Sequence, residues 1–170
     1  MVKNPESIES PRYTNIQQIT LVTLRILIGW HFLYEGMVKI VNPEWSAEMY
    51  LKDSKGLFSG IFNWLAANQD FLSVVNQLNM WGLLLIGLAL IFGLYTRYFC
   101  YAGVCLLALY YLAAPPFLGY TYIMPLEGSY LLVNKNLIEL VALLVLIAFP
   151  SSHIIGLDRL LINKGIKSNS

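Results

Sequence analysis

The chain has 170 residues, of which 57% are hydrophobic and 12% are charged, and its mean hydropathy is +0.60. An ordinary soluble domain carries about 25% charged residues, so this composition excludes one and predicts an integral membrane protein in contact with a lipid bilayer. The net charge of +1 gives no basic surface for nucleic acid, and partners must be recognised by local sites.

Four apolar stretches are predicted to cross the membrane, at residues 16–41, 79–95, 98–114 and 131–149. The first is long enough, at about 1.5 Å per residue, to cross a hydrocarbon core of about 30 Å. Residues 81–118 carry one charge, Arg97, and are too long for one span, so a turn is expected at residues 95–97. The sequence therefore predicts a four-transmembrane-helix bundle formed by a single domain, residues 1–170.

The segments between these stretches set the predicted orientation. Residues 44–79 mix aromatic, apolar and charged residues, which is typical of short helices at the headgroup level, and residues 154–161 predict another surface segment. Lys3, Arg12, Arg97, Arg159, Lys164 and Lys167 lie on the side of the termini, against Lys39, Lys52, Lys55 and Lys135 on the other side. The positive-inside rule therefore places both termini in the cytoplasm of a bacterial or archaeal cell and both long loops outside.

The N-terminal residues and the two cysteines predict no further chemistry. Residues 1–15 are polar, so the first apolar helix is expected to serve as an uncleaved insertion signal. Cys100 and Cys105 match neither a C-x-x-C redox pair nor a metal-ligand set, and we interpret both as buried apolar residues.

The first stretch carries ionisable residues at helical spacing. His31, Glu35 and Lys39 follow one another at i, i+4 and i+8, so they share one face of a helix. Such residues in a membrane helix cost about 2.5 to 3.5 kcal/mol and face a partner or a wet cavity. The fourth stretch begins at the same depth with Asn134, Lys135, Asn136 and Glu139. We expect the two polar groups to face each other across an outward-opening pocket, capped by the loop helices and residues 120–130.

Five short motifs are distributed over most of the chain. They are RILIGWHFLYEGMVK at residues 25–39, WSA at 45–47 with Tyr50-Leu51, NMWGL at 79–83, GLYTR at 93–97 and YLLVNKNLIE at 130–139. Together they resemble the DoxX/DoxD family of small four-helix membrane proteins, which includes DoxD, the membrane subunit of thiosulfate:quinone oxidoreductase. The resemblance implies electron transfer from thiosulfate, which becomes tetrathionate, to a membrane quinone. It also implies a second, DoxA-type subunit, which this chain does not contain.

Three residues are candidates for moving protons. His31 is either a core histidine bonded to a neighbouring helix or the proton carrier for a quinone carbonyl, since an ordinary histidine pKa near 6.5 allows transfer in both directions. Glu35 would orient His31 or relay its proton outward. Glu139 is either part of a capping box that begins at Asn136 or a third catalytic residue.

The remaining candidates would bind the donor or the quinone ring. Arg25 is either in a structural ion pair with Glu139 or Glu35, or an anchor for an anionic or quinone oxygen. Lys135 either snorkels to the headgroups or forms with Lys39 a cationic lip for thiosulfate, beside Asn136. Trp30, Tyr34 and Tyr130 belong to the aromatic interface belt or stack on a quinone ring.

No nucleotide, haem or iron–sulfur motif is present, and the spacing of His31 and His153 excludes a shared metal or haem. A redox role therefore requires a diffusible membrane quinone. Two non-enzymatic classes stay open: an anchor or assembly subunit for a periplasmic redox partner, and a carrier of small anions or lipids, for which four short spans leave little room. The oligomeric state, including a homo-oligomer, is also open.

Overall fold

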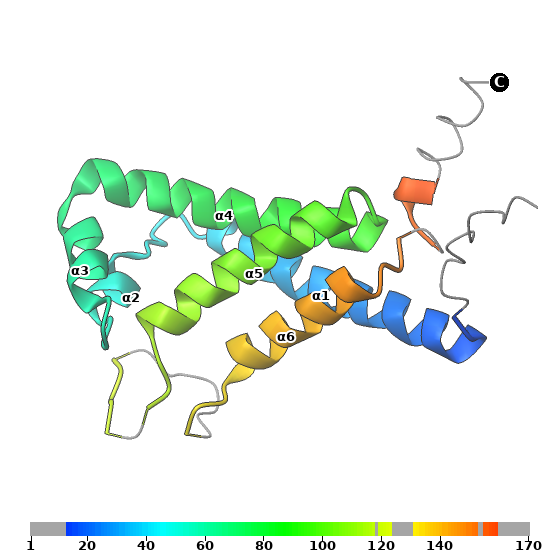
Figure 1. Ribbon diagram of the computed structural model, residues 1–170. Helices are drawn as coiled ribbons and strands as arrows, with labels where there is room; N and C mark the ends of the chain where they lie inside the picture. The colour runs from blue at the N-terminus through cyan, green and yellow to red at the C-terminus, as the bar shows by residue number, and fades with distance from the viewer. Residues whose placement is uncertain (1–12, 118, 124–130, 153–154, 160–170) are drawn as a thin grey trace, which may run out of the picture.

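A computed structural model describes residues 13–117, 119–123, 131–152 and 155–159. Within these residues the chain forms α1 (Asn15–Val41), α2 (Glu48–Lys52), α3 (Ser59–Ala67), α4 (Gln69–Phe92), α5 (Thr96–Ala113) and α6 (Lys135–Ala148). No strand occurs among them, so the all-helical prediction is confirmed. Figure 1 shows α1, α4, α5 and α6 packed together, with α2 and α3 at one end.

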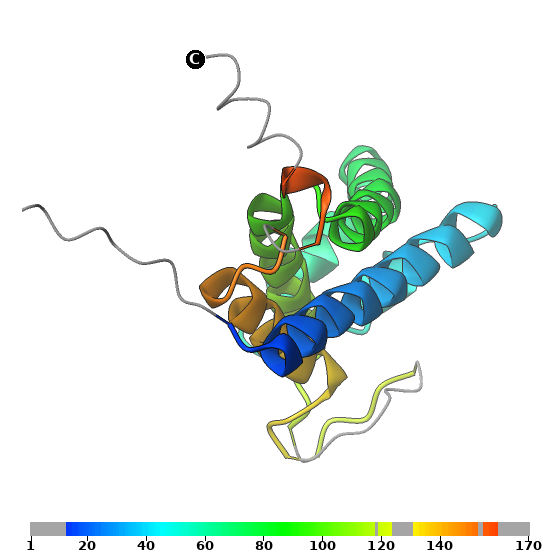
Figure 2. The same ribbon diagram turned by 90° about the vertical axis from the view of Figure 1, so that its right-hand side faces the viewer.

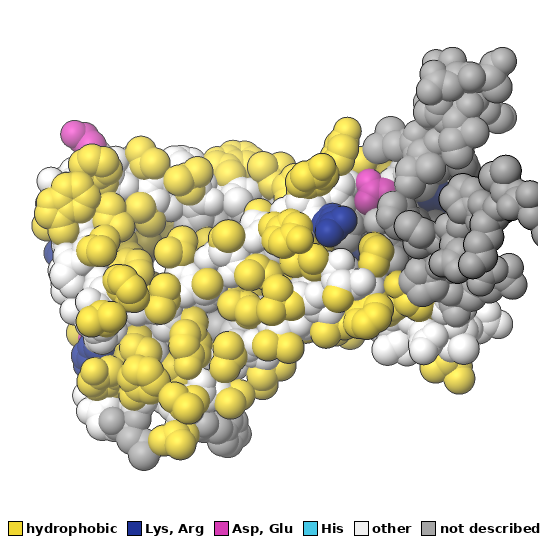
Figure 3. Space-filling view, in the orientation of Figure 1, with side chains coloured by type: hydrophobic (Ala, Val, Ile, Leu, Met, Phe, Trp, Pro, Cys, Tyr) yellow, Lys and Arg dark blue, Asp and Glu magenta, His cyan; other side chains and the backbone are white. Residues whose placement is uncertain are grey.

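Three of these helices, α1, α4 and α5, are long and apolar enough to cross a membrane. The helix α6 has 14 residues, which at about 1.5 Å per residue is about 21 Å, shorter than a hydrocarbon core of about 30 Å. The predicted fourth span is therefore not confirmed. Hydrophobic side chains cover most of the face in Figure 3, and its few charged side chains lie toward the two ends, as contact with lipid requires.

The four longer helices share one apolar core. Its buried members are Ile28, Phe32, Leu83, Ile86, Leu90, Cys100, Leu107, Leu143 and Leu146. The helices are arranged as two closely packed pairs, α1 against α4 and α5 against α6, while α1 and α6 touch along a shorter length (Figures 1 and 2). Large side chains on the outer faces, such as Leu27 at 62% exposed, are left for the lipid.

Backbone contact between α1 and α4 depends on glycine. A Cβ atom on Gly87 would lie 2.4 Å from the Leu33 nitrogen and 2.7 Å from the Gly29 carbonyl oxygen. A Cβ on Gly36 would lie 2.7 Å from the Leu84 nitrogen. Small residues let membrane helices approach this closely, whereas Gly82, on the same helix, would meet nothing within 4 Å.

The second long helix, α4, begins at Gln69, ten residues before the predicted start at residue 79. Residues 69–79 contain no helix breaker, and two of their polar side chains, Asn76 and Asn79, bond to neighbouring segments, whereas Gln69, Asp70, Ser73 and Gln77 are exposed. The Asn76 Oδ1 accepts from the Ala47 nitrogen at 2.9 Å, and the Asn79 Nδ2 donates to the Tyr110 hydroxyl at 2.7 Å. The short helices predicted for residues 44–79 are present as α2 and α3, but the last part of that segment belongs to α4.

The end of the bundle that contains the α4–α5 turn and residues 151–159 is called the turn end. The predicted turn at residues 95–97 is found two residues earlier, because Gly93 ends α4 with a φ of 66° and Thr96 already begins α5. The Asp158 nitrogen donates to the Gly93 oxygen at 2.9 Å. The Asp158 carboxylate accepts from the Tyr95 and Thr96 nitrogens at 2.7 and 3.3 Å. The segment predicted to lie on the surface is thus packed against this turn, in its described part.

The opposite end, where α1 ends, α2 and α3 lie and α6 begins, is called the loop end. A second apolar cluster joins α2 and α3 to α4 and α5 through Ala47, Leu51, Phe62, Ala66, Leu72 and Ala113. The Asp53 carboxylate accepts from the Ile123 nitrogen at 2.6 Å, and the Tyr122 hydroxyl donates to the Pro115 oxygen at 2.8 Å. Partial burial raises the pKa of Tyr122 to about 12. The hydroxyl is therefore protonated at neutral pH and keeps its hydrogen bond to the Pro115 oxygen.

Candidate functional site

Four ionisable side chains meet between α1 and α6: His31, Glu35, Lys39 and Glu139, called the polar cluster. The His31 Nδ1 lies 2.7 Å from the Glu139 Oε1, and the His31 Nε2 lies 4.0 Å from the Glu35 Oε1. The Lys39 Nζ donates to the Glu35 Oε2 at 3.0 Å. The structure therefore brings Glu139, one member of the polar group predicted at the start of the fourth stretch, into contact with the polar face of α1.

The hydrogen bond of His31 identifies Glu139, rather than Glu35, as the carboxylate that orients the imidazole. Glu139 is 9% exposed and lies on the inward side of α6, in the turn before core residue Leu143. A carboxylate bonded to Nδ1 fixes the tautomer, so the neutral ring presents its Nε2 lone pair and the charged ring presents a second N–H.

Two atoms of this pair have no hydrogen-bond partner. The His31 Nε2 and the Glu139 Oε2 are both buried and unpartnered. An unpaired buried polar atom costs about 1 to 3 kcal/mol and calls for an explanation, such as a ligand. The two unpartnered atoms belong to one hydrogen-bonded pair, so the His31–Glu139 pair keeps unused hydrogen-bonding capacity.

Lys39 and Lys135, at the loop end, both lie near a carboxylate and do not form a site of excess positive charge. Lys39 is bonded to Glu35 and lies 5.5 Å from the Trp45 ring centroid. Lys135 is exposed and lies within electrostatic range of Glu35. Both lysines therefore lie near the Glu35 carboxylate of the polar cluster.

The start of α6 differs from the expected capping box. Asn134, not Asn136, is the N-cap, and its Oδ1 accepts from the Leu137 nitrogen at 3.0 Å. The capping interpretation of Asn136 and Glu139 is therefore wrong: Glu139 lies beyond the first turn of α6, where its carboxylate is left to bind His31.

The cap at Asn134 gives a direct comparison. Asn134→Ala should destabilise α6 by about 1 kcal/mol, because the Leu137 N–H loses its acceptor. Asn136→Ala removes no cap and should change stability by less than about 0.5 kcal/mol. Hydrogen exchange at the first turn of α6 would measure both, and equal protection in the two variants would contradict the assignment.

Arg25 lies away from the polar cluster, at the turn end. It is 1% exposed, and its guanidinium donates to the Ile155 carbonyl oxygen at 2.7 Å and to the Ser151 Oγ at 3.4 Å. Asp158 is within electrostatic range. Neither expected partner, Glu35 or Glu139, bonds to it among the described residues, and the structure gives Arg25 a role in holding Ser151 and Ile155.

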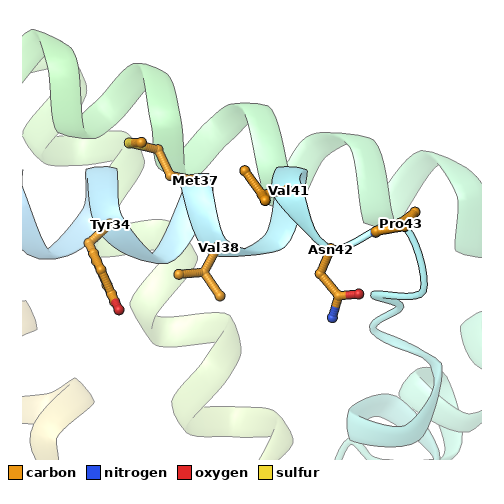
Figure 4. Close-up of a pocket in the computed structure, with 6 residues that line it drawn as sticks. All are labelled: Tyr34, Met37, Val38, Val41, Asn42 and Pro43. Atoms are coloured by element: carbon orange, nitrogen blue, oxygen red, sulfur yellow. The ribbon is translucent and has the colours of Figure 1, made fainter.

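The aromatic candidates lie on the outer face of α1. Trp30 is 60% exposed and Tyr34 is 57% exposed. Tyr34 lines an open hollow of about 520 Å³ with Met37, Val38, Val41, Asn42 and Pro43. Figure 4 shows Tyr34 and Val38 on one side of α1 and Met37 on the other. The third candidate, Tyr130, lies outside the described residues.

Sequence reasoning missed two polar residues near the polar cluster, Asn79 of α4 and Tyr110 of α5. Their side chains are hydrogen-bonded to each other, and Tyr110 is within electrostatic range of Glu35. The available signal was the helical spacing of Asn76 and Asn79, which puts two amides on one side of α4.

The two cysteines are possible metal ligands together with the acidic side chains and histidine. No group of three or more His, Cys, Asp or Glu side chains that could hold a metal ion is found in the described part of the chain. Cys100 is buried as expected, whereas Cys105 is exposed on the outside of α5, so its predicted burial is wrong. An apolar environment suits a neutral thiol, which explains its place on a lipid-facing surface.

Apolar helices with exposed hydrophobic faces and an internal polar cluster define a helical integral membrane protein with ionisable side chains between its helices. The model of the DoxX family matches residues 20–118, more than half of the chain, and the chain belongs to this family. This match begins within α1, covers α2 to α5 and stops before α6 and Glu139. Comparison with curated proteins and with solved structures gives no match.

Proposed function

We propose that the polar cluster binds the head group of a membrane quinone and moves the protons that accompany its reduction. The observation that carries this proposal is the pair of unpartnered buried atoms, the His31 Nε2 and the Glu139 Oε2. A quinone oxygen accepts a hydrogen bond from a charged imidazole, and a quinol hydroxyl donates one to a neutral imidazole or a carboxylate. The same two atoms therefore suit both redox states.

Reduction of the quinone to the quinol takes up two electrons and two protons. His31 donates the Nε2 proton to a quinone oxygen while Glu139 stabilises the charged ring through Nδ1. Glu35, at 4.0 Å from Nε2, and Lys39 extend the polar cluster toward the loop end, so they carry the replacement protons from water. Glu139 is thus a positioning residue for His31 as well as a ligand contact.

The two electrons would come from two thiosulfate ions, which join through a new sulfur–sulfur bond to give tetrathionate. Lys39 is bonded to Glu35, and the polar cluster has no excess positive charge to hold a dianion. We therefore place thiosulfate oxidation on a DoxA-type partner at the loop end and quinone reduction in this chain. In this proposal α6 is the fourth span, both termini are cytoplasmic, and the loop end is on the outer side of the cytoplasmic membrane.

Quinone turnover tests the proposal. Membranes that contain the chain and its partner should reduce a short-chain quinone in the presence of thiosulfate. His31→Ala and Glu139→Gln should each lower kcat/KM at least about tenfold, or about 1.4 kcal/mol. Leu27→Ala, one turn away on the exposed side of α1, is the matched control and should retain the wild-type rate.

Direct binding separates catalysis from anchoring. The purified chain should bind the short-chain quinone, and His31→Ala should weaken that binding. A folded chain that binds no quinone, together with equal rates in His31→Ala and wild-type membranes, would overturn the proposal in favour of a non-catalytic anchor subunit.

A further inference from the structure

Asn79 is a buried amide in the middle of α4 with one polar atom left over. Its side chain is 9% exposed, its Nδ2 donates to the Tyr110 hydroxyl at 2.7 Å, and its Oδ1 is buried without a partner. The Tyr110 hydroxyl accepts this bond, and its own proton has no acceptor among the described residues. The pair thus keeps one spare acceptor and one spare donor.

This incomplete bonding does not depend on which way the amide is turned. If the oxygen and nitrogen of Asn79 were exchanged, the Tyr110 hydroxyl would donate to the oxygen, and the nitrogen would be the unpartnered atom. A buried amide group without its hydrogen bonds is costly in an apolar environment. Either orientation leaves the pair able to bind one more polar group.

The register of the helices places this pair one level beyond Glu139 and two levels beyond His31, toward the loop end. A Cβ on Gly103 would meet both Leu143 and Phe32, which sets these residues at one level. Counting toward the loop end, one turn reaches Glu35, Leu107 and Glu139, and about one further turn reaches Tyr110 of α5. Asn79 is bonded to Tyr110 and lies at the same level.

His31 is next to Phe32 at the first level, so Tyr110 lies about two helical turns, or roughly 11 Å, from it along the axis, which is comparable with the separation of two groups that hydrogen-bond the opposite oxygens of one quinone ring. Tyr110 is also within electrostatic range of Glu35, which connects the two levels. The two pairs therefore lie along the bundle axis at a spacing that suits the two ends of one ring.

We propose that Asn79 and Tyr110 bind the second oxygen of the quinone head group, opposite the oxygen held by His31 and Glu139. This inference rests on the proposed function and deepens it. The Tyr110 hydroxyl donates to that oxygen when it is a carbonyl, and the Asn79 Oδ1 accepts from it when it is a quinol hydroxyl. Binding at both ends fixes the orientation of the ring, so Asn79 and Tyr110 select ligands with two opposed oxygens.

Binding of two probes to the purified full chain tests this assignment. The probes are a short-chain 1,4-benzoquinone and a phenol with the same ring substituents and one oxygen. Tyr110→Phe should weaken binding of the quinone about tenfold and leave binding of the phenol unchanged. Tyr111→Phe removes a hydroxyl from the next residue, which donates to the Leu132 oxygen, and should change neither.

A measurement on the wild-type chain keeps the test independent of the stability of Tyr110→Phe. Quinone binding should shift the C–O stretch of a tyrosine in an infrared difference spectrum, and ring-deuterated tyrosine should move this band. Wild-type quinone affinity in a folded Tyr110→Phe chain, or the absence of a tyrosine band in wild type, would overturn the assignment. If His31→Ala still loses quinone binding in that case, the proposed function stands, whereas a wild-type chain that binds no quinone defeats both.

Discussion

Gly87→Val should destabilise the folded bundle by about 3 kcal/mol or more, the largest effect expected from a single substitution in this chain. The added Cβ would lie 2.4 Å from the backbone nitrogen of Leu33, and a backbone cannot move aside as a flexible side chain can. The helices α1 and α4 would have to separate along their whole contact. Unfolding of the purified chain by SDS in mixed micelles would measure the loss.

Gly82→Val is the matched control for this prediction. It makes the same change in the same helix, five residues away, where a Cβ meets nothing within 4 Å. It should alter stability by less than about 0.5 kcal/mol. Equal losses in the two variants would mean that the glycines act through helix propensity rather than through contact between α1 and α4.

Arg25→Ala should destabilise the chain by about 3 kcal/mol and release residues 155–159 from the turn end. The substitution leaves the Ile155 carbonyl oxygen without its donor and opens a cavity where the guanidinium lay. Hydrogen exchange should accelerate at the Asp158 amide, which donates to the Gly93 oxygen in the intact structure.

Arg97→Ala controls for the loss of a positive charge near the same end. Arg97 is exposed at the start of α5, so its removal should leave both stability and exchange close to wild type. If Arg25→Ala instead preserved exchange at Asp158 but abolished ligand binding, Arg25 would be an anchor for a ligand oxygen and not a structural residue.

Helical periodicity was sufficient to predict which residues of α1 share the polar face, because that property depends on one helix alone. The equal depth of the two polar groups in the membrane predicted that the start of α6 would lie opposite. The choice between Glu35 and Glu139 as the partner of His31 depends on how α6 is rotated about its axis, and that rotation is set by packing against α5 through Gly103 and Leu143. Sequence spacing contains no such information.

The predictions for the partners of Arg25 and for the start of α4 were wrong for the same reason, because both depend on contacts between distant segments. Arg25 is bonded to Ser151 and Ile155, more than 120 residues away, and nothing near it in the sequence indicates this partner. The polar residues before residue 79 indicated an interfacial segment, but Asn76 and Asn79 are accommodated by Ala47 and Tyr110 inside the fold. A membrane helix can therefore begin earlier than its hydropathy suggests when neighbouring segments supply hydrogen bonds.

The contact between Arg25 and residues 151–155 also constrains how the chain is made. Arg25 belongs to α1, and its hydrogen-bond partners are synthesised after every described helix from α1 to α6. Until then the bilayer holds an arginine without these partners, at a cost of about 2.5 to 3.5 kcal/mol on insertion scales. Synthesis of Ser151 and Ile155 and completion of the fold around Arg25 are thus coupled, and a nascent chain that stops before Ser151 exposes an uncompensated charge within α1.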